Sequence, residues 1–320
     1  MIQLENYLVL NRYMHHLLGV EDFETLKNLL RSLPEGPESS GQSRFFGRLI
    51  TQPNLRIDRD KLRQYDRRIM NYETQLRKAR RDFHGFRYFQ YLALLYTEIF
   101  LDCLTNDPSL FVAELNAFLD DLRHQEPELA EFPYFEPDNL RRLAFFMATG
   151  SGKTLLMHVN ILQVLHYLQH GLHPEAILPG KTQERRFSNI LLITPTEVLS
   201  TQHIAELRKS GLNAVLFIEN PHGSSNILGP TVKVIEIQKL VDEPSKEGVS
   251  VVIDEIENGN LVIVDEGHKG NGSEAQTWKN RQKRLSEGGF LLEYSATFAQ
   301  AIAAANSQRA QKQLLKEYGQ

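Results

Sequence analysis

The stretch that decides the fold is "MATGSGKT", residues 147–154, which follows the apolar run "LAFF" at 143–146 and leads into "LLMHVNILQVLHYLQH" at 155–170. The glycines allow backbone N–H groups to turn inward around phosphate oxygens, and a helix that starts here adds a partial positive charge. Lys153 can reach the β- and γ-phosphates of a nucleotide, and the Thr154 hydroxyl can bind Mg²⁺. The stretch therefore predicts a phosphate-binding loop between a strand and a helix.

Short apolar runs continue along the chain after this loop and alternate with helical segments. Together with the run at the loop itself, they cover residues 143–149, 189–195, 213–219, 231–237, 260–266 and 290–297. Continuous apolar runs separated by helices are typical of a parallel sheet that helices cover on both faces. The sequence therefore predicts a doubly wound α/β domain, which we place over residues 136–320.

The first 135 residues show a different pattern, with helical periodicity and few strand signals. Predicted helices lie near residues 3–18, 21–32, 58–83, 86–105 and 109–124. A loop rich in Gly, Pro and Ser covers residues 33–43. We therefore expect an α-helical N-terminal domain over residues 1–135, ahead of the α/β domain.

The composition is that of an ordinary globular protein, and the net charge of −4 argues neither for nor against a nucleic-acid partner. Cys103 is the only cysteine, so no internal disulfide can form and a reducing compartment is expected. The N-terminus carries Glu5 and no basic segment, unlike a signal peptide. The apolar stretch 88–104 is short for a membrane span and contains Glu98 and Asp102. We expect a cytoplasmic protein without a membrane partner.

Charge is segregated in the N-terminal half. Residues 51–90 hold 11 Lys and Arg against 5 Asp and Glu, whereas residues 91–140 hold 1 Arg against 11 Asp and Glu. The basic segment 59–81 either forms a solvated helix face or follows a nucleic-acid backbone. Acidic residues interleave with the basic ones along this segment, which favours the solvated face.

A phosphate-binding loop requires one acid for the metal's water shell and a second acid to activate the attacking water. Two pairs follow apolar runs: Asp254 with Glu255 in "VSVVIDEIE", and Asp265 with Glu266 in "NLVIVDEGHKG". The second pair directly follows four apolar residues and is followed by a Gly-His dipeptide and, further on, by the sequence S-A-T. These features favour the second pair, and we interpret the first as surface charge or the end of an extra element.

Four motifs, taken in order, resemble motifs I, Ia, II and III of superfamily 2 DEAD/DEAH-type helicases. They are "MATGSGKT", "TPTEVLSTQ" at 194–202, "VDEGH" at 264–268 and "YSATF" at 294–298. The chain is most similar to the helicase/UvrB N-terminal group, which includes the restriction (Res) subunit of type III restriction enzymes. The resemblance covers about residues 143–300 and implies the first RecA-like lobe of a P-loop NTPase. Met147 stands where the strict loop pattern has Gly, as in many helicase-like ATPases.

The resemblance implies that ATP and Mg²⁺ are the cofactors. The residues expected to bind the nucleotide phosphates are Thr149, Gly150, Ser151, Gly152, Lys153 and Thr154. The residues expected to hold the metal are Thr154 and Asp265. The residues expected to take part in catalysis are Lys153, Asp265 and Glu266, with Glu266 as the base that activates water.

Two further sets of positions match the family. The residues expected to couple the nucleotide to the nucleic acid are His268, Ser295 and Thr297. The residues expected to contact the nucleic-acid backbone are Thr194, Pro195 and Gln202. Ordinary strand-end capping is the alternative for Thr194, Ser295 and Thr297.

One more position matches the family upstream of the loop. "RYFQYLA", residues 87–93, has the R-x-[YF]-Q-x-x-A form in which Gln90 would read the adenine base. Gln90 lies 63 residues before Lys153, so residues 106–140 would be an insertion between the two. A satisfied polar group at the domain interface is the alternative for Gln90.

The resemblance implies an ATP-dependent DNA helicase or translocase with a restriction or defence function. Its implied partners are double-stranded DNA, a methyltransferase or modification subunit, and a second RecA-like lobe in cis or in trans. No Q-x-x-G-R-x-x-R motif follows Thr297, so we expect slow hydrolysis or none until a second lobe supplies its arginines. The alternatives are a regulatory fragment that binds nucleotide or DNA without turnover, and a P-loop kinase or ATPase that acts on a small molecule.

Two other clusters of residues give weaker indications of function. His166, His170 and His173 have helical metal spacing but lack the carboxylate of an H-E-x-x-H motif, so we interpret them as surface or interdomain histidines. A basic cluster faces either the nucleic acid or solvent, and it comprises Lys279, Arg281, Lys283 and Arg284.

Overall fold

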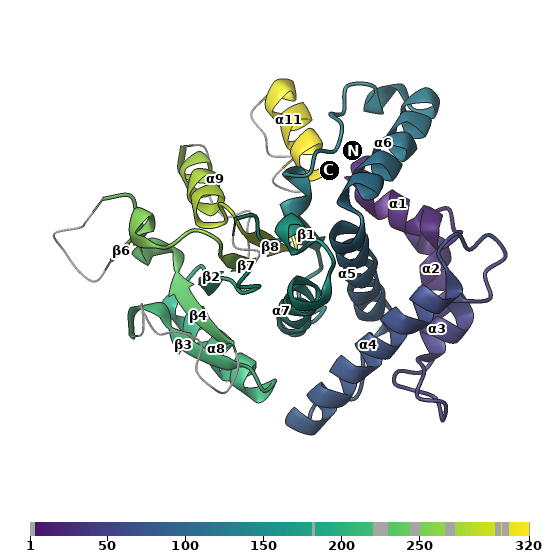
Figure 1. Cartoon of the computed structure of the whole chain (residues 1–320), viewed down its shortest axis with the longest axis horizontal. Helices are drawn as coiled ribbons and strands as arrows, with labels where there is room; N and C mark the ends of the chain where they lie inside the picture. The colour runs from purple at the N-terminus through teal and green to yellow at the C-terminus, as the bar shows by residue number, and fades with distance from the viewer. Residues whose placement is uncertain are drawn as a thin grey trace. The chain divides into compact units, whose positions relative to one another are not determined.

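Two compact units make up the chain in the computed structural model (Figure 1). The helical unit comprises Met1–Asn139 together with Ala299–Gln320, and the sheet unit comprises Leu140–Phe298. The sequence-based division placed the boundary between residues 135 and 136 and assigned residues 299–320 to the α/β domain. The residues that the structure describes are 4–180, 183–219, 230–243, 250–265, 273–297, 302 and 307–319.

The helical unit contains the helices that periodicity predicted. Among the described residues, its α-helices include α1 (Val9–Leu17), α2 (Phe23–Leu30), α3 (Arg44–Leu49), α4 (Arg59–Ala79), α5 (Tyr88–Asn106), α6 (Pro108–Gln125) and α11 (Gln308–Gly319). Two of them, α3 and α11, were not predicted. α3 has only six residues, which is too few for a helical period to show, and α11 has few apolar positions among its Gln and Lys residues.

Side-chain caps explain where several of these helices begin. The carboxylates of Asp22, Asp58 and Asp107 accept hydrogen bonds from backbone N–H groups in the first turns of α2, α4 and α6. The Ser43 hydroxyl does the same for α3. The first N–H groups of a helix have no partner within it, so these caps stabilise each start. Pro108 follows Asp107 at the first position of α6, where its missing N–H is no loss.

The apolar stretch at residues 88–104 forms most of α5, and its apolar side chains lie in the core of the helical unit. One of its two acidic residues, Glu98, is fully buried, and Glu98 Oε2 accepts a hydrogen bond from Nε of Arg68 on α4 at 2.6 Å. Burial on several sides explains why α5 lacks a polar face. Within the described part of the chain, no helix is both long and apolar enough to cross a membrane.

The sheet unit is built on a parallel sheet. In the described residues it has six strands in the order β1-β8-β7-β2-β4-β3. The strands are β1 (Arg142–Phe146), β2 (Ile190–Thr194), β3 (Asn213–Leu216), β4 (Thr231–Glu236), β7 (Leu261–Asp265) and β8 (Phe290–Ser295). Each of the six predicted apolar runs forms one of them, which confirms the predicted α/β class. A small parallel sheet of β5 (Leu240–Val241) and β6 (Val251–Val252) was not predicted.

Helices lie on both faces of the six-stranded sheet, and strand side chains alternate between the two faces. On one face, α9 (Ser273–Leu285) packs on the strands in a cluster that includes Leu191, Val262, Leu291, Trp278 and Leu285. On the other face lie α7 (Lys153–His170) and α8 (Glu197–Lys209), and the Tyr294 hydroxyl of β8 donates to Asn160 of α7 at 2.7 Å. Figure 1 shows α8 along β3 and β4. Burial on both faces explains why the strands read as continuous apolar runs.

Candidate nucleotide site

The "MATGSGKT" stretch forms a loop between β1, which ends at Phe146, and α7, which begins at Lys153. Gly150 and Gly152 have φ angles of 76° and 88°, a left-handed conformation that glycine adopts without strain. A Cβ on Gly150 would meet nothing within 4 Å, so open space adjoins the loop at this position. The two glycines therefore let the chain turn from strand into helix beside open space.

Lys153 and Thr154 lie in the first turn of α7, and both are half-buried. The carbonyl oxygen of Gly152, which precedes the helix, accepts hydrogen bonds from the backbone N–H groups of Leu155 and Leu156. The start of a helix directs N–H groups and a partial positive charge toward the space ahead of it. A phosphate ahead of α7 would thus meet the helix N-terminus and the Lys153 ammonium together.

The strand order brings the motifs to one edge of the sheet. β1, β8, β7 and β2 are consecutive neighbours and run parallel, so their carboxyl ends lie on the same side. The register aligns Phe146 with Ser295, and Tyr294 with Asp265. The loop after β1, Asp265 at the end of β7, and Thr194 at the end of β2 therefore share the edge at which parallel α/β sheets bind ligands.

The backbone joins the loop to the end of β8. The Met147 N–H donates to the Ser295 carbonyl oxygen at 3.0 Å. The Ser295 hydroxyl is buried and accepts a hydrogen bond from the Thr297 N–H at 3.1 Å. This second contact is the strand-end capping that was the alternative for Ser295, so the coupling role of Ser295 and Thr297 stays a prediction.

Asp265 ends β7, and its carboxylate has one hydrogen-bond partner among the described residues. Asp265 Oδ2 lies 3.0 Å from Nε2 of His203 on α8, and the two side chains are 13% and 5% exposed. His203 belongs to none of the motifs, and sequence reasoning missed it. The buried stripe of α8, formed by Ser200, His203 and Leu207, is the signal that would have turned this histidine toward the sheet. Glu266 and His268 lie outside the described residues.

The three residues expected at the nucleic acid are placed differently. Thr194 is buried, and its hydroxyl lies 2.6 Å from the Ser200 hydroxyl of α8. Pro195 is half-buried, and Gln202 is exposed on α8. The Thr194 side chain is therefore engaged inside the unit, as its capping alternative requires, whereas Gln202 is open to a partner.

Gln90 lies in the first turn of α5, in the helical unit. Its Oε1 accepts a hydrogen bond from the backbone N–H of Arg87 at 2.9 Å, and the residue is 8% exposed. This contact closes the first turn of α5, as expected for the alternative of a satisfied polar group. Adenine recognition by Gln90 stays a prediction.

The first acidic pair and the basic cluster meet each other in the structure. Asp254 and Glu255 are exposed and lie in a 3₁₀ turn after β6, outside the six-stranded sheet. Arg284 pairs with Asp254 and also with Asp242, and Arg281 pairs with Asp242 at 2.7 Å. The hydrogen bond from Arg281 lowers the pKa of Asp242. Arg281 and Arg284 therefore tie α9 to the small sheet, and the first acidic pair supplies surface charge.

The three histidines of the "HYLQHGLH" segment make separate contacts. His166 and His170 have ring centroids 4.6 Å apart, and His173 Nδ1 lies 2.8 Å from Glu175 Oε1. Over the residues that the structure describes, no three His, Cys, Asp or Glu side chains converge as metal ligands would. His170 and His173 are exposed, and His166 is half-buried.

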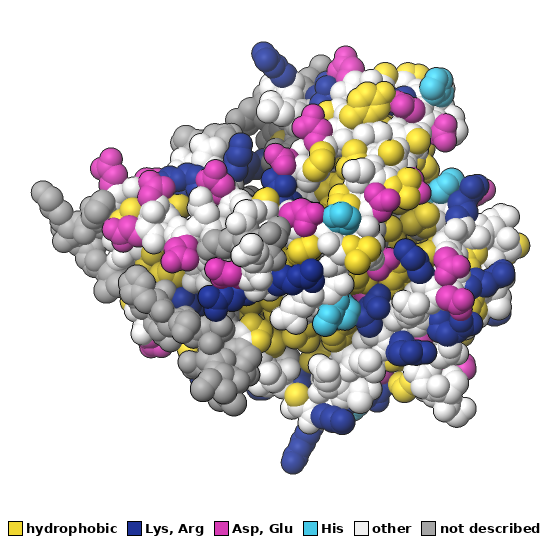
Figure 2. Space-filling model, in the orientation of Figure 1, with side chains coloured by type: hydrophobic (Ala, Val, Ile, Leu, Met, Phe, Trp, Pro, Cys, Tyr) yellow, Lys and Arg dark blue, Asp and Glu magenta, His cyan; other side chains and the backbone are white. Residues whose placement is uncertain are grey.

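Acidic side chains form ion pairs with basic side chains along α4. The ion pairs that involve α4 include Lys61–Asp102, Arg63–Asp60, Arg68–Glu98 and Arg77–Glu73. Figure 2 shows Lys and Arg side chains interspersed with Asp and Glu on the face that it draws. The pairing favours the solvated-face interpretation of residues 59–81 over a track for a nucleic-acid backbone.

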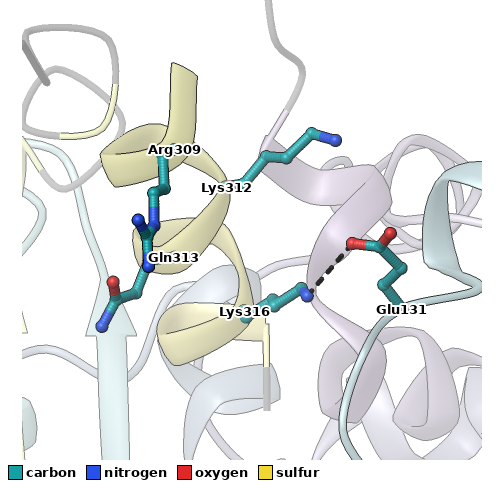
Figure 3. Close-up of a pocket in the computed structure, with 5 residues that line it drawn as sticks. All are labelled: Glu131, Arg309, Lys312, Gln313 and Lys316. Atoms are coloured by element: carbon teal, nitrogen blue, oxygen red, sulfur yellow. Dashed lines mark hydrogen bonds and ion pairs between the residues drawn. The ribbon is translucent and has the colours of Figure 1, made fainter. Parts of the chain in front are cut away.

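A separate cavity of about 540 Å³ lies in the helical unit beside α11. Figure 3 shows that Lys316 of α11 points to Glu131, and the Nζ to Oε2 distance is 3.3 Å. The other lining residues are Arg309, Lys312 and Gln313. None of the five is buried, so this is an open, mostly basic surface and no enclosed site.

A family model described as type III restriction enzyme, res subunit, matches residues 112–300. The matched range contains the phosphate loop and all six strands of the large sheet. No curated protein and no solved structure matches the chain.

Proposed function

The chain belongs to the family of the type III restriction enzyme res subunit, and on this premise we propose that its sheet unit is the ATP-binding first lobe of an ATP-dependent DNA translocase. The observation that carries the proposal is the shared edge of β1, β8 and β7, which sets the phosphate loop and Asp265 two strands apart. Neighbouring strands lie about 4.8 Å apart, so the ends of β1 and β7 are roughly 10 Å apart, a separation that the phosphates of one nucleotide and their metal could bridge.

Residues at this edge suit the nucleotide and its metal. Backbone N–H groups from Gly150 to Thr154 and the Lys153 ammonium would hold the phosphates, and open space adjoins Gly150. The Thr154 hydroxyl and the Asp265 carboxylate are the oxygen ligands that Mg²⁺ prefers. Bound Mg²⁺ would neutralise charge on the phosphates. Glu266, the next residue after Asp265, would orient the attacking water.

DNA would bind along the neighbouring part of the same edge. β2 pairs with β7, and the loop after β2 leads into α8, so Pro195 and the exposed Gln202 lie close in the fold to the strand that carries Asp265. We place double-stranded DNA here and assign the chain to restriction or defence, with a methyltransferase or modification subunit as a partner. A second RecA-like lobe would supply the arginines that complete the site.

The phosphate loop is tested by removing its charge. Lys153→Ala should strongly weaken binding of a fluorescent ATP analogue with Mg²⁺, because the phosphates lose their main counter-charge in the loop, and circular dichroism should show an intact fold. Lys209→Ala is the matched control, since Lys209 is an exposed lysine of α8 whose partner is Glu206. A folded Lys153→Ala variant that binds as tightly as wild type would overturn the assignment.

DNA coupling has its own test. With the second lobe present, in a longer chain or a partner, hydrolysis should rise when double-stranded DNA is added. ATP turnover that double-stranded DNA does not stimulate would indicate a P-loop enzyme that acts on a small molecule. Nucleotide binding without turnover would indicate a regulatory module.

A further inference from the structure

We propose that His203 is a positioning residue for Asp265, and that it holds the carboxylate in the orientation that Mg²⁺ requires. This inference rests on the proposed function, because it assigns the metal to Asp265. Its basis is the 3.0 Å contact between His203 Nε2 and Asp265 Oδ2, made between side chains that are 5% and 13% exposed. A hydrogen bond so well shielded from water holds its two partners in a fixed geometry.

The fold brings the two side chains together for a simple reason. Residues alternate between the faces of β7, and Val262 and Val264 pack in the cluster on the α9 face. Asp265 is next in the alternation, so it points to the opposite face, where α8 lies. His203 is on the buried stripe of α8 and meets it there. The contact is therefore a consequence of strand register and helix packing.

The ring nitrogens indicate which atom donates. The Nδ1 atom of His203 is buried and has no hydrogen-bond partner among the described residues. With a proton on Nε2, the ring donates to Asp265 Oδ2. With its only proton on Nδ1, the ring would instead turn a lone pair toward the carboxylate and bury an unmet N–H. The donor is therefore Nε2.

This hydrogen bond leaves one carboxylate oxygen for the metal. Within the described residues, Oδ2 of Asp265 accepts from His203, and Oδ1 accepts no hydrogen bond. Removing a partner that orients a metal-binding side chain in this way typically lowers the affinity for the metal about 10- to 100-fold. Without His203, the carboxylate can rotate about its last bond, and Oδ2 loses its buried partner.

A pair of matched amide variants isolates the hydrogen bond. In His203→Gln the amide nitrogen reaches about as far as Nε2, whereas in His203→Asn it reaches only as far as Nδ1. His203→Leu removes every donor and keeps an apolar side chain in the core. His158→Leu is the control, because His158 is also a buried, helix-borne histidine of this unit, and its Nδ1 bonds to Ser210.

The measurement is equilibrium binding of a fluorescent ATP analogue to the full 320-residue chain, titrated with free Mg²⁺ and repeated in EDTA. The Mg²⁺ concentration for half-maximal enhancement should rise about 10-fold or more in His203→Asn and His203→Leu. It should stay close to the wild-type value in His203→Gln and His158→Leu. Binding in EDTA should be the same in all five proteins, because the phosphate loop is unchanged.

The outcomes separate this inference from the function on which it rests. Asp265→Asn serves as the reference for a lost metal ligand. If the wild type shows no Mg²⁺-dependent binding, the proposed function fails and this inference fails with it. If Asp265→Asn abolishes the Mg²⁺ dependence while folded His203→Asn or His203→Leu keeps it, only the role of His203 is overturned. Should neither of those two variants fold, a folded His203→Gln that matches Asp265→Asn would overturn it as well.

Discussion

The helical unit and the sheet unit each hold a carboxylate that is mostly shielded from solvent, but they hold it in different ways. In the helical unit the side chain of Glu73 is 2% exposed, and both of its oxygens are used: Oε1 accepts from Arg77, and Oε2 accepts from the Phe86 N–H at 3.1 Å. In the sheet unit Asp265 is 13% exposed, and the described residues satisfy only Oδ2. A carboxylate with both oxygens engaged supports the fold, whereas one with an open oxygen at a sheet edge can bind a ligand.

The largest effect on activity is expected at Glu266, the residue that follows Asp265. With the second lobe present, Glu266→Gln should keep ATP binding and reduce turnover by about 10²-fold or more, the range for the loss of a general base. Single-turnover hydrolysis and equilibrium nucleotide binding measure the two quantities. Glu255→Gln is the matched control at an exposed carboxylate and should be near neutral. The reverse result would move the catalytic pair to Asp254 and Glu255.

The next largest effect comes from variants of Glu73 and Asp265, which compare the two carboxylates directly. Glu73→Gln should lower the free energy of unfolding by about 1–3 kcal/mol, because an amide cannot pair with Arg77 and satisfy the Phe86 N–H as the carboxylate does. ATP affinity of the folded variant should not change. Asp265→Asn should show the opposite pattern, with stability kept and the Mg²⁺ dependence of binding lost. Urea unfolding and nucleotide titration measure both variants. Equal losses of stability in the two variants would contradict the assignment of Glu73 to the fold and of Asp265 to ligand binding.

The smallest effect concerns pH and Asp66, a carboxylate that is buried in the helical unit. Burial raises the pKa of Asp66 from 3.8 to about 6, although hydrogen bonds from the Tyr91 hydroxyl and the Ser43 N–H act in the other direction. The folded chain therefore holds this proton to a higher pH than the unfolded chain. The stability that the group contributes is present below about pH 4 and is lost as the pH rises through 6.

A comparison with Asp66→Asn isolates that contribution. Between pH 5 and pH 7 the wild type should lose about 1 kcal/mol of unfolding free energy relative to the variant. Urea unfolding at the two pH values measures the difference. Other titrating groups, such as His15, whose pKa burial lowers to about 4, cancel because both proteins carry them. A difference that does not change with pH would contradict the assignment.

Sequence patterns predicted the elements of this fold better than its contacts. The six apolar runs became the six strands, and the long helices α4, α5 and α6 lie where their periods placed them. α3 was missed because six residues are too short to show a period. No sequence pattern indicated that the Thr194 hydroxyl lies against Ser200. A residue at the buried end of a strand faces the helix that covers it, and the contact of Thr194 with nucleic acid stays a prediction.

By itself, the sequence determined which residues form strands, where α7 begins, and where the loop can take its two left-handed positions, which are glycines. Each of these features depends on neighbours within a few residues. Only the tertiary structure decided that β8 lies between β1 and β7, that His203 meets Asp265 across 62 residues of chain, and that Arg281 and Arg284 turn to Asp242. Such contacts depend on which strands pair and which helix covers them, and a local period carries no record of either.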